Sequence, residues 1–264
     1  MTFFSAKNIT AGYGGKIINS EISFDMDAGC ILGILGANGS GKTTLLKSLC
    51  GILPHEGTCI LQDTVLEDLS SRQLAGLCSY IPQRSGIGID ISALDVVLMG
   101  FNPQLGILQH PDSSMKERAR QMLKEVGLEG KEHMNYLHLS EGQKQMCILA
   151  RTLVSDSRLL LLDEPESALD FQYRYQMLKM IRKWVKEEER GALVTLHDPS
   201  LALNCCDRLL LLSDGQVLDT ICPSSDELEK MENLLRKIYG PVSLLRCRGR
   251  NGREQLIMIR EDEE

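Results

Sequence analysis

Continuous apolar runs alternate with amphipathic stretches along the 264-residue chain. Runs of this kind are typical of strands that are covered on both faces of a parallel sheet. They occupy residues 30–35, 158–163, 192–197 and 207–215. Helical patterns lie near them, in residues 43–51 and 174–190. This alternation predicts an α/β core with a mostly parallel sheet.

The helical pattern of residues 174–190 has one apolar face. Its members are Met177, Leu178, Ile181 and Val185, with Trp184 beside them. Because these positions recur at helix spacing, we expect the face to pack into the core and not to bind a cofactor.

Two further parts of the chain depart from the alternation. Residues 1–30 and 56–66 contain short extended segments bounded by glycine or charge, which predict an N-terminal antiparallel β subdomain. From about residue 84 to residue 153 the apolar positions recur at helix spacing, and Ser92 and Ser113 are the predicted N-caps. This segment predicts an α-helical subdomain inserted between two strands of the core.

The composition narrows the functional classes. Hydrophobic residues make up 43% of the chain, and no apolar run approaches the roughly 20 residues of a membrane-spanning helix. The net charge of −7 and the pI near 5.4 argue against a nucleic-acid surface, which needs a concentrated basic face.

The nine cysteines are scattered and no histidine pair has helical ligand spacing, so we expect reduced, mostly buried thiols and no structural metal site. Because the N-terminus lacks the pattern of a secretory signal, we expect the chain to stay where it is made.

Residues 36–44, GANGSGKTT, follow an apolar strand and precede a helix. Residues 36–43 match the pattern G-x-x-x-x-G-K-[ST], whose glycines let backbone N–H groups turn toward phosphate oxygens at a helix N-terminus. We expect Lys42 to contact the β and γ phosphates and the hydroxyl of Thr43 to bind Mg²⁺. The predicted nucleotide-binding residues are Gly36, Ala37, Asn38, Gly39, Ser40, Gly41, Lys42, Thr43 and Thr44.

Two adjacent carboxylates, Asp163 and Glu164, follow a buried strand, where an α/β sheet presents its ligand-binding edge. We expect Asp163 to hold Mg²⁺ through water and Glu164 to orient or deprotonate the attacking water. The alternative is an acidic strand end that only caps the next turn.

Together with these motifs, the sequence LSEGQ at residues 139–143 makes the chain resemble the ATP-binding subunit of an ABC transporter, over residues 4–220. The resemblance implies a P-loop ABC-type ATPase domain over residues 1–220, with the helical insertion at about residues 84–153. Residues 221–264 then form a small C-terminal extension that consists of a helical pattern, two strand-like runs and an acidic tail.

The resemblance implies roles for four more residues. Tyr13 stacks on adenine, and Gln83 joins the core to the helical insertion and contributes to catalysis and to Mg²⁺ binding. His197 is the switch histidine, and Asp170 ends the loop that follows the carboxylates and belongs to the nucleotide site. Taken singly, Tyr13 could be a turn aromatic, Gln83 a strand-end amide and His197 an ordinary strand-end histidine. The implied catalytic residues are Glu164, His197, Lys42 and Gln83.

The resemblance also implies that the active unit is a head-to-tail dimer with a second ATP-binding subunit, here most simply a homodimer. Each ATP lies between the loop of residues 36–43 of one chain and Ser140, Gly142 and Gln143 of the other.

Two positions depart from the family pattern, which usually has glycine where Glu141 stands and threonine where Glu166 stands. Both changes add negative charge near the γ phosphate or at the interface between the two subunits. They therefore predict that the closed, ATP-bound dimer is less stable than is usual in the family. The alternative for Glu141 is that it turns away and pairs with Lys144.

The family likeness implies an ATP-dependent importer subunit that drives transmembrane permease subunits and serves a substrate-binding protein indirectly. Residues 95–106 and 195–215 are most similar to subunits for iron-siderophore, haem or cobalamin import, and we expect an iron complex as cargo, with haem, cobalamin or another metal species as alternatives. This implies a cytoplasmic location, peripheral on the inner face of the membrane. Two other classes remain open, a soluble ABC ATPase such as an iron-sulfur cluster assembly factor and a regulatory module that binds ATP without hydrolysing it.

Overall fold

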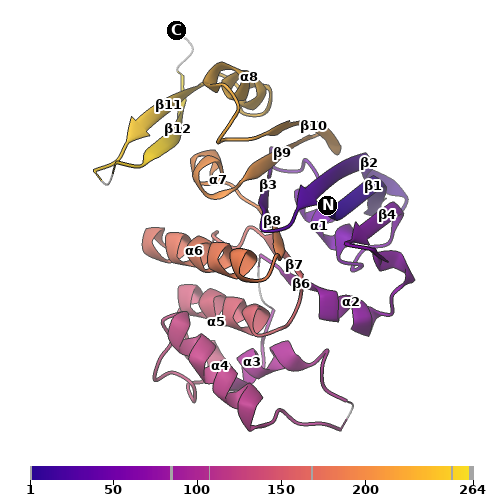
Figure 1. The fold of residues 1–264 in the computed structure, drawn as a ribbon, viewed down its shortest axis with the longest axis vertical. Helices are drawn as coiled ribbons and strands as arrows, with labels where there is room; N and C mark the ends of the chain where they lie inside the picture. The colour runs from indigo at the N-terminus through magenta and orange to yellow at the C-terminus, as the bar shows by residue number, and fades with distance from the viewer. Residues whose placement is uncertain (1, 84–85, 107, 168, 251, 262–264) are drawn as a thin grey trace.

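The computed structural model describes every residue except 1, 84–85, 107, 168, 251 and 262–264 (Figure 1). The predicted start of the helical insertion at residue 84 and the end of the acidic tail therefore lie outside the described residues.

Within this part of the chain, a six-stranded sheet forms the centre of the molecule, in the order β10-β9-β3-β8-β7-β6. The strand bounds are β3 Ile31–Leu35, β6 Cys78–Ile81, β7 Leu159–Asp163, β8 Gly191–Thr195, β9 Arg208–Ser213 and β10 Gln216–Ile221. Every neighbouring pair is parallel except β9 and β10. The predicted α/β class and mostly parallel sheet are thus confirmed. The edge strand β6 ends shortly before Gln83, which the sequence places at a strand end, whereas β10 was not predicted because polar residues interrupt its apolar pattern.

Alternate residues of β7 enter two different hydrophobic clusters. Leu159 and Leu161 pack with helix α1 (Lys42–Leu49) and the N-terminal sheet. Leu160 and Leu162 pack with the helices on the opposite face. The uninterrupted leucines of this strand therefore reflect a sheet that is covered on both faces.

The strands that come directly before and after α1 in the chain form an antiparallel sheet, in the order β2-β1-β4-β5. Its strands are β1 Thr2–Tyr13, β2 Lys16–Asp27, β4 His55–Leu61 and β5 Thr64–Val65. The predicted N-terminal β subdomain is confirmed. A short 3-10 turn, η1 (Leu66–Asp68), leads from this sheet to α2 (Ser71–Leu77) and then to β6.

Helices occupy the predicted insertion between β6 and β7, and they lie at one end of the molecule (Figure 1). They are α3 Ala93–Leu98, η2 Met99–Phe101, α4 Ser113–Glu125, η3 Tyr136–His138 and α5 Glu141–Leu153. Ser92 caps α3 as predicted, through a hydrogen bond from the Asp95 N–H. The predicted cap Ser113 is wrong, because the carboxylate of Asp112 accepts from the Met115 N–H and Ser113 becomes the first helical residue.

Helix α6 (Phe171–Glu187) covers the sheet with the face that the sequence predicts. Its buried residues are Met177, Leu178, Ile181, Trp184 and Val185. The expected core packing is thus confirmed.

The C-terminal extension consists of α8 (Leu228–Tyr239) and the hairpin of β11 (Val242–Arg248) and β12 (Glu254–Arg260), at the other end of the molecule (Figure 1). It is joined to helix α7 (Pro199–Cys205), where the Asn204 amide donates to the Leu256 carbonyl at 2.7 Å and accepts from the Leu256 N–H at 3.0 Å. The extension also shares a hydrophobic cluster with the core. No helix in the described part of the chain is long and apolar enough to cross a membrane.

Candidate nucleotide-binding site

The loop of residues 36–41 connects β3 to α1 at the carboxyl end of the central sheet. Gly39 and Gly41 have φ angles of 83° and 99°, which favour glycine. A Cβ at Gly36 would lie 2.4 Å from the Leu212 carbonyl oxygen, so this position also needs glycine. Helix α1 begins directly after Gly41, and its first N–H groups are available to an anion.

Lys42 lies across this loop and is only 6% exposed. Its ammonium group donates to the carbonyls of Gly36 at 2.8 Å and Ala37 at 3.2 Å. Burial lowers the pKa of Lys42, while the nearby carboxylates of Glu164 and Asp163 oppose this shift. The side-chain oxygen of Ser40 is buried and has no hydrogen-bond partner among the described residues. The loop thus presents a cation and an unused hydroxyl where a phosphate is expected.

Asp163, at the end of β7, is held by three hydroxyl groups. Oδ1 accepts from Thr43 and from Thr195, each at 3.0 Å, and Oδ2 accepts from Tyr80 at 3.2 Å. Burial raises the pKa of the Tyr80 phenol, and the Asp163 charge adds to the shift, so this phenol remains a hydrogen-bond donor. The Thr43 and Asp163 oxygens form the oxygen-only donor set that Mg²⁺ prefers. Thr195 and Tyr80 were not predicted, and a polar residue within each apolar strand was the available signal.

Glu164 adopts a left-handed backbone conformation with φ 48°, which turns its side chain out of the strand direction. Its Oε2 accepts from the Gln83 amide at 2.7 Å and lies 2.6 Å from His197 Nε2. Its backbone N–H donates to the Thr195 hydroxyl at 2.8 Å. Two predicted catalytic residues from separate segments, Gln83 and His197, therefore meet at one carboxylate oxygen of a third, Glu164.

Glu166, which the sequence predicted to add negative charge near the γ phosphate or the dimer interface, lies behind this group and is 2% exposed. Its Oε1 accepts from the His197 N–H at 2.9 Å, while Oε2 has no partner among the described residues. Burial raises the pKa of this carboxyl group. Glu166 thus holds the backbone of the histidine that contacts Glu164.

An open cavity of about 300 Å³ connects the phosphate loop to the N-terminal sheet. Tyr13 lies at the end of β1 on its wall and is 49% exposed, so its ring is accessible to a ligand. The lining residues are Tyr13, Ile18, Asn38, Gly39, Gly41, Lys42, Thr43, Thr44 and Glu164. The sequence prediction contains all of them except Ile18.

The LSEGQ segment of residues 139–143, called the signature residues below, lies on a different surface, at the start of α5. Ser140 caps this helix, and Gln143 completes the reciprocal capping box. A Cβ at Gly142 would lie 3.6 Å from the Leu169 side chain, next to Asp170, which caps α6. Among the described residues, none of this group lines the cavity that contains the phosphate loop.

The side chain of Glu141 is exposed and forms an ion pair. Its Oε1 lies 2.8 Å from Lys144 Nζ, one helical turn away. In the single chain, the alternative predicted from the helix spacing is therefore the observed one.

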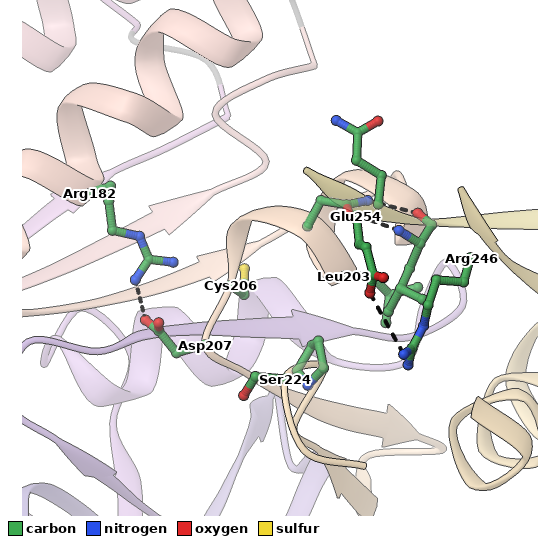
Figure 2. Close-up of a pocket in the computed structure, with 11 residues that line it drawn as sticks. Arg182, Leu203, Cys206, Asp207, Ser224, Arg246 and Glu254 are labelled. Carbon is green, nitrogen blue, oxygen red and sulfur yellow. Dashed lines mark hydrogen bonds and ion pairs between the residues drawn. The ribbon is translucent and has the colours of Figure 1, made fainter. Parts of the chain in front are cut away.

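A second hollow, of about 410 Å³, lies between α7, the start of β9 and the C-terminal hairpin (Figure 2). Its charged groups are already paired, Arg182 with Asp207 and Arg246 with Glu254. Asp207 also accepts from the Ile31 N–H at 2.7 Å, which ties the hollow to β3. These contacts hold the extension and α6 to the core.

A phosphate loop at the carboxyl end of a parallel sheet, with an Asp-Glu pair beside it, defines the class of P-loop ATPases. The family model described as ABC transporter matches residues 19–167, and the chain belongs to this family. The resemblance found in the motifs and the expected ATPase activity are thereby confirmed.

Two relatives show the extent of the sequence similarity. The hemin import ATP-binding protein HmuV of Bordetella pertussis is 35% identical, over 89% of this chain and 91% of that protein. A Helicobacter pylori protein named "Probable iron chelatin transport ATP-binding protein" is 38% identical, over 80% of this chain and 84% of its own length.

Solved structures show the same fold. A solved structure described as "An inward-facing conformation of a putative metal-chelate type ABC transporter" aligns with a TM-score of 0.82 and 24% identity, over 98% of each chain. The dimeric ATP-binding cassette MJ0796 bound to ADP and Pi aligns with a TM-score of 0.74 and 24% identity, over 83% of this chain and 98% of that chain.

Proposed function

We propose that the chain is the ATP-hydrolysing subunit of an importer for haem or an iron chelate such as a ferric siderophore. The convergence of Gln83 and His197 on Glu164, beside a cavity that contains Lys42, supports the hydrolytic role. The hemin and iron chelatin relatives support the class of cargo.

In this proposal ATP occupies the cavity of about 300 Å³. The Tyr13 ring stacks on adenine, and the loop amides and Lys42 bind the phosphates. The Lys42 ammonium exchanges its carbonyl contacts with Gly36 and Ala37 for phosphate oxygens.

The oxygen atoms of Thr43 and Asp163 fit Mg²⁺. The side-chain oxygen of Gln83, at the junction with the helical insertion, would be a further ligand. When bound, the ion supplies positive charge to the β and γ phosphates. The Thr195 and Tyr80 hydroxyls keep Asp163 oriented toward Thr43.

Glu164 acts as the general base toward water, in reach of the γ phosphate. Gln83 and His197 position its Oε2 atom by hydrogen bonding. Glu166 maintains the His197 backbone in the required place.

A head-to-tail dimer brings the signature surface of a second copy onto the bound ATP. The start of α5, with Ser140 and Gly142, is exposed or partly exposed and does not line the cavity of its own chain within the described residues. Its N-terminal amides suit an anion supplied by the partner.

The permease subunits would dock in an open groove of about 330 Å³ between α2, β6, η2 and α5. Tyr80 lines this groove and contacts Asp163. In the sequence, Tyr80 lies shortly before Gln83. Docking there links the permease to the hydrolytic residues and places the chain on the inner face of the membrane. The substrate-binding protein acts through the permease.

A complementation experiment tests the proposal. A strain that lacks this gene receives the wild-type gene or the Glu164→Gln variant and grows with haem or a ferric siderophore as the sole iron source. We expect growth on at least one source to require the gene and to fail with Glu164→Gln. Growth on both sources without the gene would contradict the importer and favour a soluble ABC ATPase. ATP hydrolysis by the purified wild-type chain, absent in the variant, excludes the regulatory module.

A further inference from the structure

Three side chains of different chemistry converge on the N-terminal sheet, outside the nucleotide cavity. His55 and Cys59 lie on β4, four residues apart, so the strand's alternation places them on the same face. Glu67 reaches them from η1, after the hairpin of β4 and β5. One ligand atom of each residue lies within 4.8 Å of the other two.

The contacts within this group are specific. His55 Nε2 lies 3.0 Å from Glu67 Oε1 and 3.9 Å from Cys59 Sγ. The Cys59 N–H donates to the same Glu67 oxygen at 2.7 Å, which fixes the carboxylate beside the thiol. The imidazole nitrogen, the sulfur and the carboxylate oxygen therefore face a common point.

The group is sheltered and yet accessible. Cys59 is fully buried, and the His55 side chain is 9% exposed. His55 also lines an open hollow of about 350 Å³, together with residues on either side of the β1–β2 turn. The Glu67 side chain is 30% exposed, so an ion can approach the group from the side of this carboxylate.

We propose that His55, Cys59 and Glu67 form a site for a divalent transition metal, best suited to Zn²⁺. Imidazole, thiolate and carboxylate are all ligands of Zn²⁺, and the thiolate discriminates against Mg²⁺ and Ca²⁺. The thiolate and the carboxylate together neutralise a divalent ion, so the complex carries no net charge into the buried strand. Three protein ligands leave one position of a four-coordinate ion for water.

Metal binding exchanges one proton for the ion. Burial raises the pKa of the Cys59 thiol, and the Glu67 carboxylate adds to the shift, so the metal-free protein holds a neutral thiol. A bound metal ion deprotonates a coordinating thiol. The S–H bond is broken, the S–metal bond forms and the proton leaves to solvent, with no change in oxidation state.

Cobalt titration of the full-length chain tests this site. The protein is freed of metal, kept reduced and saturated with Mg²⁺, so that Co²⁺ is not taken up by oxygen ligands at the nucleotide site. We expect one equivalent of Co²⁺ to produce a sulfur-to-cobalt charge-transfer band, and Zn²⁺ to displace it. Absence of the band overturns the proposal and leaves a His-Glu hydrogen bond beside a buried thiol.

Substitutions assign the ligands. Cys59→Val keeps the strand apolar and should abolish the band, whereas His55→Gln and Glu67→Gln should each weaken Co²⁺ binding at least about tenfold. The matched controls Cys147→Ala and His110→Gln, in the helical region, should bind as wild type does. A band that survives Cys59→Val, or wild-type affinity in both of the other ligand variants, overturns the assignment. If Cys59→Val does not fold, His55→Gln and Glu67→Gln still test the assignment.

Discussion

His197 and Glu164 are in direct contact, with Nε2 and Oε2 separated by 2.6 Å. Replacing Glu164 by glutamine retains the shape and removes the base, so we expect ATP turnover to fall by about 10²- to 10⁴-fold. ATP binding should survive, and the variant should accumulate as an ATP-bound dimer on gel filtration. The matched control is Glu117→Gln, which removes an exposed carboxylate on α4, outside the lining of the cavity, and should retain turnover. Turnover in Glu164→Gln near that of the control would contradict the assignment of the base.

Tyr13 lies on the wall of the cavity and is half exposed, so a ligand can contact its ring. Replacement by alanine should weaken ATP binding by about 1 to 3 kcal/mol, by analogy with base stacking on aromatic side chains. Phenylalanine should bind nearly as well as tyrosine because it retains the ring. Calorimetry on the single chain measures this, and an unchanged dissociation constant in Tyr13→Ala would leave Tyr13 as a turn residue.

Glu166 should make stability depend on pH. Its pKa is raised in the folded chain, so on raising the pH the unfolded chain loses this proton first. Glu166 therefore stabilises the folded chain below its ordinary pKa of 4.5. This stabilisation is lost as the pH rises toward the raised pKa that Glu166 has in the folded chain. Glutamine removes the titration and retains the acceptor for the His197 N–H.

Urea unfolding of the wild type and Glu166→Gln at several pH values measures this effect. We expect the variant to gain stability relative to the wild type as the pH rises above 4.5, with Glu141→Gln as a surface control. A difference between Glu166→Gln and the wild type that is constant with pH would show that Glu166 titrates normally.

Glu141 pairs with Lys144 in the single chain, although its side chain is 75% exposed. Glu141→Gly removes this pair and adds glycine to the first helical turn, which should lower the free energy of unfolding by about 1 kcal/mol. Because the carboxylate is turned toward Lys144, ATP-driven dimerisation in the Glu164→Gln background should change less than about twofold, a difference below 0.5 kcal/mol. Sedimentation at low and high salt measures it. Several-fold tighter dimerisation at low salt would mean that Glu141 contacts the partner's ATP.

The phosphate loop and the Asp163-Glu164 pair could be predicted from the sequence because each is contiguous and follows a strongly apolar strand. The contacts of Tyr80 and Thr195 with Asp163 could not, since they join three strands that are distant in sequence. A single hydroxyl within an apolar strand does not indicate which carboxylate it will meet.

The His55, Cys59 and Glu67 group was missed for a related reason. These residues have no helical ligand spacing, because two of them lie on one strand and the third follows a hairpin. Ser113 was predicted as a cap because serine caps helices well, but the preceding aspartate competes for the same N–H group and prevails.

The position of β3 in the sheet has a consequence for synthesis of the chain. This strand carries the phosphate loop, and its two neighbours, β8 and β9, are made only after residues 36–190 have followed it. Loop closure over such a separation slows folding, so the nucleotide cavity forms late. Until then the apolar edges of β3 are open to other chains, and nascent or truncated forms should depend on chaperones to avoid aggregation.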